Sequence, residues 1–137
     1  MIVRYRSFPN RRGGLIYRPL IMVKIKYKTM SFYTWGLLDS GADRTSFNKE
    51  IGKNLGIDFN SCTMSTAQGI SGNEQEAWDT QVEIEVAGFE KNIFKADVSF
   101  IESKAIGVIL GHTGFFEFFD VKLQTAKRQF EIELARG

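Results

Sequence analysis

The stretch GLLDSGADRTSF, residues 36–47, runs from apolar residues directly into an aspartate and then into small residues. A carboxylate at the end of an apolar strand is costly, because loss of water disfavours its charged form. The hydroxyl of Ser40 can donate or accept a hydrogen bond, and Gly41 and Ala42 let another backbone come close. The pattern therefore indicates that Asp39 lies in a tight turn beside a second copy of itself, where two carboxylates share one proton.

This stretch resembles the catalytic signature of the retropepsin-like aspartic proteases, the retroviral-type peptidases, in which two hydrophobic residues precede Asp, Ser or Thr, Gly and Ala. AIGVILGHTGFF, residues 105–116, is similar to the family's apolar strand that ends in glycine beneath the active-site turn. AQGISGNEQ, residues 67–75, lies between the two, where the family has its flap. The resemblance implies a mostly β fold: a retropepsin-like closed β-barrel, or acid-protease half-domain, with one or two short helices and a flap hairpin. An ordinary strand-ending Asx turn at Asp39 is the alternative.

The resemblance also implies roles for individual residues. Asp39 matches the catalytic aspartate, and no metal or cofactor is expected. His112 stands where retroviral members have an arginine that pairs with the residue matching Asp43, so this ion pair is either replaced or lost. A surface hairpin without function is the alternative for the flap. The residues that match dyad-supporting positions are Ser40, Gly41 and Ala42, and those that match substrate-binding positions are Asp43, Gly69, Ile70, Ser71, Gly72 and Ile109.

One chain supplies half of such a site. A pepsin-like monomer needs two Asp-Thr/Ser-Gly turns, and in WDTQV the residue after Asp79 and Thr80 is Gln81 instead of glycine. The resemblance therefore implies a homodimer with two Asp39 carboxylates across a two-fold axis. It would be an aspartic endopeptidase that hydrolyses peptide or protein substrates by general acid–base activation of a water. The alternative is a dimerisation or peptide-binding module of the same fold with little or no turnover.

Period-two alternation, which is typical of strands, dominates the rest of the chain. The run 106–111 is apolar throughout and predicts a strand buried on both faces, with a buried helix turn as the alternative. Asn48 and Gly56 bound a pattern that predicts one short helix. Residues 112–121 carry four phenylalanines and predict a second short helix or a turn. The alternating segments are LIMVKIKY (20–27), FYTWGLLD (32–39), TQVEIEVAGF (80–89) and NIFKADVSF (92–100), followed by a closing hairpin from VKLQT (121–125) and QFEIEL (129–134).

Residues 1–16 differ in composition from the rest of the chain, since they are rich in arginine and contain Pro9 and the pair Gly13-Gly14. They are predicted to form a basic, flexible leader before a single retropepsin-like domain over residues 17–137. An RNA-contacting arm is one alternative. Another is a processing segment that is trimmed near residues 11–14.

The length, composition and charge of the chain make several classes of function less expected. The chain has 137 residues, is 43% hydrophobic and carries a formal charge of +2, which gives little reason to expect nucleic acid as a partner. Membrane insertion is not expected, because the sequence has no apolar run long enough to cross a bilayer, and it has no secretory signal. The single Cys62 cannot form an internal disulfide, so a buried or half-buried free thiol and a cytoplasmic location are expected. One histidine, His112, makes a His-based metal site or triad hard to build.

Overall fold

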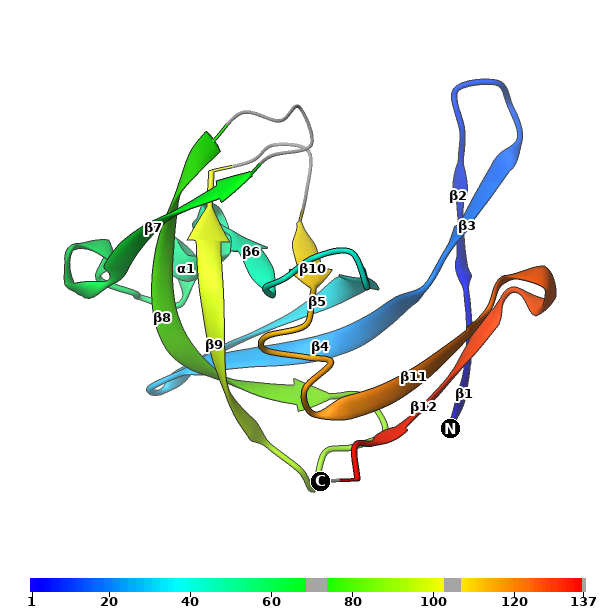
Figure 1. Ribbon diagram of the computed structural model, residues 1–137. Coiled ribbons are helices and arrows are strands. Elements are labelled where there is room, and N and C mark those ends of the chain that lie inside the picture. Colours follow the sequence, from blue (N-terminus) through cyan, green and yellow to red (C-terminus); the bar gives the residue numbers. More distant parts are fainter. Residues whose placement is uncertain (69–73, 103–106, 137) are drawn as a thin grey trace.

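The computed structural model describes residues 1–68, 74–102 and 107–136, and these residues are mostly in strands (Figure 1). Seven strands form one sheet in the order β4–β5–β10–β6–β9–β8–β7, and β4 also pairs with β8. The sheet therefore closes on itself into a barrel of six of the described strands, which confirms the predicted mostly β barrel. The strands of this sheet are β4 (Leu20–Tyr27), β5 (Met30–Leu38), β6 (Ser46–Asn48), β7 (Thr63–Gln68), β8 (Glu74–Val86), β9 (Phe94–Ile101) and β10 (Val108–Leu110).

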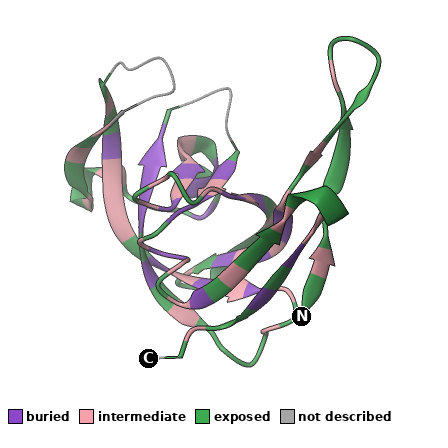
Figure 2. Cartoon of the chain, turned by 45° about the vertical axis from the view of Figure 1, so that its right-hand side comes forward, coloured by how far each residue is buried: buried purple, intermediate pink, exposed green. Residues whose placement is uncertain are grey.

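Alternating side chains on β4 and β8 build the barrel core. Val23 and Ile25 of β4 lie opposite Val86 and Ile84 of β8, and all four are buried. Successive side chains of a strand point to opposite faces, so one apolar residue in two is enough to fill the barrel. In Figure 2 the buried residues, in purple, lie on the strands that surround the barrel interior. The period-two pattern of the sequence thus predicted which face of β4 and of β8 is buried.

The strand β10 joins two parts of the chain that are far apart in sequence. It runs parallel to β5, with Ile109 opposite Leu37, and antiparallel to β6, with Ile109 opposite Ser46. Val108 and Leu110 are buried whereas Ile109 is half-buried, so the predicted burial is complete on one face of this strand only. This strand places residues that follow it next to residues that follow β5.

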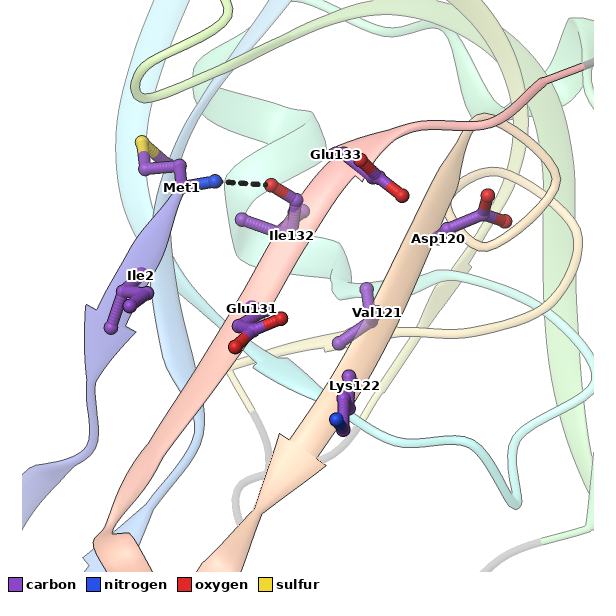
Figure 3. Close-up of a pocket in the computed structure, with 8 residues that line it drawn as sticks. All are labelled: Met1, Ile2, Asp120, Val121, Lys122, Glu131, Ile132 and Glu133. Carbon is purple, nitrogen blue, oxygen red and sulfur yellow. Dashed lines mark hydrogen bonds between the residues drawn. The ribbon is translucent and has the colours of Figure 1, made fainter.

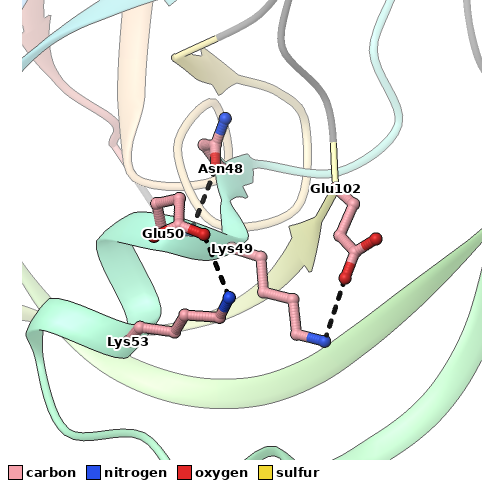
Figure 4. Close-up of polar contacts among 5 residues, drawn as sticks. All are labelled: Asn48, Lys49, Glu50, Lys53 and Glu102. Atoms are coloured by element: carbon pink, nitrogen blue, oxygen red, sulfur yellow. Dashed lines mark hydrogen bonds and ion pairs between the residues drawn. The ribbon is translucent and has the colours of Figure 1, made fainter.

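The predicted short helix is α1 (Lys49–Asn54). The side chain of Asn48 accepts a hydrogen bond from the Glu50 amide at 2.9 Å, and Gly56 has a φ of +78°, a left-handed conformation that glycine adopts readily. Two ion pairs lie on the outside, Lys53 with Glu50 at 3.0 Å and Lys49 with Glu102 at 3.3 Å (Figure 4). Both predicted ends of the helix are confirmed.

The phenylalanine-rich segment is a turn and not a second helix. Its backbone starts from Gly114, whose φ is +97°, and Phe115 and Phe119 turn inward with ring centroids 4.9 Å apart. The strand that follows is β11 (Phe119–Gln124), and it pairs with β12 (Gln129–Leu134) as the predicted closing hairpin. Two 3-10 helices complete the described elements, η1 (Phe59–Ser61) and η2 (Thr125–Lys127). None of the helices in the described residues is long and apolar enough to span a bilayer.

The prediction that residues 1–16 form a leader outside the fold is wrong. The strand β1 (Ile2–Arg4) pairs with β12 and completes a three-stranded sheet, β1–β12–β11. The strands β2 (Arg6–Pro9) and β3 (Leu15–Arg18) form a hairpin that extends away from the barrel (Figure 1). Composition misled the prediction, because Asn10, Gly13 and Gly14 build a defined turn here: Asn10 Oδ1 accepts hydrogen bonds from the amides of Arg12 and Gly14 at 2.9 and 2.8 Å.

Candidate active site

Asp39 lies directly after the last residue of β5. The amide of Leu38 donates to the Pro19 carbonyl at 3.0 Å, and the amide of Asp39 donates to the Leu110 carbonyl at 3.0 Å. Leu38 is buried, whereas Asp39 is half-buried and Ser40 is exposed. The apolar strand therefore carries the carboxylate out of the core to its rim, so that the cost of burying the charge is largely avoided.

The small residues after Asp39 form a tight turn around its carboxylate. The amide of Gly41 donates to Asp39 Oδ1 at 3.0 Å, and the amide of Ala42 donates to the Asp39 carbonyl at 3.1 Å. A Cβ on Gly41 would lie 3.3 Å from Oδ1, so glycine leaves this approach free. Ser40, Gly41 and Asp43 are exposed, which leaves one side of the turn open to a second molecule.

The segment after β10 runs alongside this turn and holds it from the other side. The amides of His112 and Thr113 donate to the carbonyls of Ala42 and Asp43, both at 2.9 Å. Gly111 is buried at the start of the segment, and a Cβ there would lie 2.5 Å from the Arg44 carbonyl oxygen. Only glycine fits between these backbones, which accounts for the glycine that follows the apolar strand.

The side chain of His112 contacts the turn itself. Its Nε2 lies 2.7 Å from the carbonyl oxygen of Ser40. A carbonyl only accepts hydrogen bonds, so Nε2 carries the proton and donates. Asp43 forms no ion pair with another described residue, and its carbonyl is the atom that the Thr113 amide binds. In place of an arginine that pairs with Asp43, this chain has a histidine that binds the backbone next to Asp39.

A polar chain beneath the turn was missed by sequence reasoning. Arg44 Nε donates to Ser99 Oγ at 3.0 Å, and Ser99 Oγ donates to Asp79 Oδ1 at 2.6 Å, although Ser99 is only 2% exposed. Asp79 is the aspartate of WDTQV, and it ties β8 and β9 to the loop after Asp39. The neighbouring Thr45 is fully buried, and its Oγ1 accepts from the Gly111 amide at 3.1 Å. The only sign of this chain in the sequence was a charged residue, Arg44, next to Asp43. Nothing in the sequence indicated that Arg44 contacts Ser99.

The remaining predicted site residues fall into two groups. Ile109 lies in β10 beside Leu37 and is half-buried, with part of its side chain accessible. The predicted flap residues Gly69, Ile70, Ser71 and Gly72 lie outside the described residues. The strands on either side of them, β7 and β8, pair antiparallel from Thr63 opposite Asp79 to Gln68 opposite Glu74.

A concave surface and a free thiol are further candidates for chemistry. A concave space of about 330 Å³ lies on the outer face of the β1–β12–β11 sheet, where Ile2 is flanked by Asp120, Glu131 and Glu133 (Figure 3). It contains none of the predicted site residues. Cys62 is a half-buried free thiol, as predicted, and burial raises its pKa, which suppresses the reactive thiolate. Within the ranges that the structure describes, no three His, Cys, Asp or Glu side chains lie together as metal ligands would.

Comparisons with known proteins agree with this geometry. A family model described as retroviral aspartyl protease matches residues 16–113. A retropepsin-like aspartic protease from Rickettsia conorii has a similar structure, with a TM-score of 0.61, 17% sequence identity and 97% of each chain covered. The EIAV protease in complex with the inhibitor HBY-793 matches with a TM-score of 0.53 and 22% identity over 69% of this chain and 82% of that protein. The sequence matches none of the curated proteins with which it was compared.

Proposed function

Because the chain belongs to the retroviral aspartyl protease family, we propose that it is an aspartic endopeptidase that works as a homodimer. The observation that carries the proposal is the Asp39 turn. Its carboxylate lies at the rim of the core, receives the Gly41 amide on Oδ1 and has an open side. That is half of a site in which two carboxylates share a proton.

The chemistry follows from two such turns placed across a two-fold axis. One Asp39 carboxylate takes a proton from a water between the two, and the water attacks the carbonyl carbon of a peptide bond. The other Asp39 is protonated and donates to the carbonyl oxygen, which gives a tetrahedral diol. Its collapse returns a proton to the leaving amine, and no covalent intermediate forms. The Gly41 amide holds the carboxylate in position through both steps.

Surrounding residues have supporting roles in this proposal. Ser40 is exposed at the tip of the turn, where its hydroxyl would bond to the second copy, and Ala42 leaves room for that approach. Asp43 and Ile109 are accessible beside Asp39 and would contact the substrate. The single unpaired Cys62 suits a reducing compartment, so the cytoplasm is the proposed location.

The experiment that tests the proposal compares peptide-library cleavage by the wild type and by Asp39→Asn over mildly acidic to neutral pH. Asparagine keeps the size of the side chain and removes the acid and base. We expect a rate loss of at least about 100-fold, since proton transfer by a positioned group contributes on this scale. Asp120→Asn is the matched control, because Asp120 is an exposed aspartate on β11 and outside the turn. Equal cleavage by the wild type and Asp39→Asn would rule out the mechanism.

A peptide-binding module of the same fold is the second candidate. The observation that favours it is Asp43, which lacks an ion pair within the described residues and so lacks the bracing that the retroviral pattern implies. This candidate predicts that the wild type and Asp39→Asn bind the same peptides equally and that neither cleaves them. Fluorescence anisotropy with labelled peptides from the same library measures this directly.

A further inference from the structure

The β2–β3 hairpin presents apolar side chains on both of its faces. Phe8 lies opposite Ile16 and Pro9 lies opposite Leu15, and neighbouring cross-strand pairs point to opposite sides of a hairpin. Phe8, Ile16 and Leu15 are 39%, 39% and 58% exposed. Exposed apolar side chains gathered in this way are typical of a surface that another molecule covers.

Cation–π contacts hold the base of the hairpin, and the tip extends beyond them. The guanidinium of Arg6 lies 4.1 Å from the centroid of the Trp35 ring, and that of Arg128 lies 3.8 Å from the centroid of Tyr17. Past these contacts the tip projects from the molecule (Figure 1). A lone two-stranded hairpin is only marginally stable in water, so a partner for the tip would stabilise it.

Charge is divided unevenly along the chain. Residues 1–38 contain eight Lys and Arg and no Asp or Glu, and the first acidic residue of the chain is Asp39. Residues 39–137 contain ten Lys and Arg against sixteen Asp and Glu. Arg11 and Arg12 lie at the exposed turn of the hairpin. The hairpin of one copy and the body of another therefore attract each other, whereas two hairpins repel.

We propose that the β2–β3 hairpin is a dimerisation arm that packs on the acidic body of a second copy of this chain, within residues 39–68, 74–102 and 107–136. The inference rests on the proposed function, because the Asp39 half-site needs a second copy of the chain. The β2–β3 hairpin would be the segment that holds this second copy. An arm of this kind covers both apolar faces of the tip and pairs Arg11 and Arg12 with carboxylates. Single-stranded RNA fits the tip less well, because Phe8 is the only aromatic side chain of residues 8–16, and Leu15 and Ile16 offer no flat surface for stacking bases.

The first test measures the dissociation constant of the dimer by sedimentation, with every chain in an Asp39→Asn background so that no chain can cleave another. The apolar variant is Phe8→Ser with Ile16→Ser, and the charge variant is Arg11→Glu with Arg12→Glu. Each is expected to weaken the dimer at least about tenfold, as loss of central interface contacts does. Added salt should weaken the wild type and change the charge variant less.

Met30→Ser with Tyr33→Ser is the matched control, since these side chains are 50% and 63% exposed and lie on β5, outside both the hairpin and residues 39–137. It should leave the dissociation constant unchanged. Circular dichroism checks that each variant keeps its strands. A dimer that is indifferent to both hairpin variants, or a chain that is monomeric at every concentration, overturns the proposal.

The second test does not depend on the variants being stable as dimers. Leu15→Cys is combined with Cys62→Ser, labelled with a photoactivatable maleimide and mixed with an isotopically heavy copy. We expect cross-links between light and heavy chains that map to residues 39–137. Cross-links within one chain only, or hairpin-dependent binding of a single-stranded RNA oligonucleotide by a monomer, overturn the proposal.

Cleavage by the unsubstituted protein is measured separately. If the dimer depends on the hairpin but does not cleave peptides, the proposed dimerisation arm is supported and the proposed endopeptidase function is contradicted. If the dimer cleaves peptides but is unaffected by the hairpin variants, the endopeptidase function is supported and the dimerisation arm is contradicted.

Discussion

Gly111 shows how closely the backbones pack behind Asp39. A Cβ at this position would lie 2.5 Å from the Arg44 carbonyl oxygen and 2.7 Å from that of Ala42. Both obstacles are main-chain atoms, so neither can rotate away as a side chain does. Any larger residue must push the 111–113 segment away from the Asp39 turn.

We therefore expect Gly111→Ala to lower the free energy of unfolding by about 1–3 kcal/mol, the usual range for overpacking. Urea denaturation followed by tryptophan fluorescence measures this. Gly107→Ala is the control, because a Cβ on Gly107 meets no atom of the described residues within 4 Å. Equal midpoints for the two variants would contradict the close packing at Gly111.

In the proposed peptidase, His112 would be a positioning residue, since its side chain contacts the Ser40 carbonyl and not the carboxylate. His112→Ala should lower kcat about tenfold or more, with a smaller change in KM, because a displaced carboxylate reacts poorly. His112→Gln restores an N–H donor and should recover part of kcat. Peptide-cleavage kinetics decide between these outcomes.

Nitrogen NMR gives a second readout that needs no cleavage. His112 is the only histidine, so one imidazole appears in the spectrum, and the contact predicts a proton on Nε2. A neutral ring with its proton on Nδ1 would rule out the hydrogen bond to Ser40.

At the scale of single elements, the turn between β10 and β11 depends on its aromatic residues. Phe115 is 1% exposed and packs on Phe119, whereas Phe116 is half-buried and points beside His112 at a ring distance of 5.6 Å. Their packing adds to the backbone hydrogen bonds of the turn, in which the Phe116 amide donates to the Gly111 carbonyl at 3.0 Å and the Glu117 amide donates to the His112 carbonyl at 3.1 Å.

Phe115→Ala is expected to lower the free energy of unfolding by about 3–5 kcal/mol, as is usual for a buried phenylalanine. Phe116→Ala should cost clearly less, because part of that ring is already exposed. Thermal and urea unfolding of both variants measures the difference. A loss at Phe116 that equals the loss at Phe115 would show that burial does not determine the stability of this turn.

The sequence predicted most of the elements, because periodicity is a local property. Val23, Ile25, Val82 and Ile84 lie inside the barrel as the alternation required. The strands of residues 1–18 were missed, since arginines and glycines there resemble a disordered leader, whereas pairing with the distant β12 orders β1. Pairing partners so far away in the chain leave no trace in local composition.

The candidate site divides in the same way. Asp39, Ser40 and Gly41 were predicted from twelve adjacent residues, and the structure shows the turn that they form. The contact between His112 and Ser40 was missed, because 72 positions separate the two residues and only the placement of β10 brings them together. The Arg44–Ser99–Asp79 chain was missed for the same reason, since its members come from three separate strands or loops.

At the scale of the whole molecule, the proposed site needs two copies of Asp39, so the two cannot act independently. Mixing wild type with Asp39→Asn in equal amounts, at fixed total protein and after re-equilibration, should leave about a quarter of the activity, because only wild-type pairs are complete. Independent sites in each chain would instead leave about half. The mixed sample is assayed with the same peptides, and an unmixed series of dilutions provides the reference.

The position of β10 between β5 and β6 also affects when the Asp39 turn can form during synthesis of the chain. A ribosome makes Asp39 well before it makes Leu110, whose carbonyl binds the Asp39 amide, and before His112, which binds Ser40. Until those residues emerge, the turn has only its own hydrogen bonds, such as that from the Gly41 amide to Asp39 Oδ1, and a chain that stops short of Val108 lacks the support from the β10 side altogether. The half-site is therefore among the last parts of the molecule to be completed during synthesis, so a nascent chain would carry the aspartate without the means to use it.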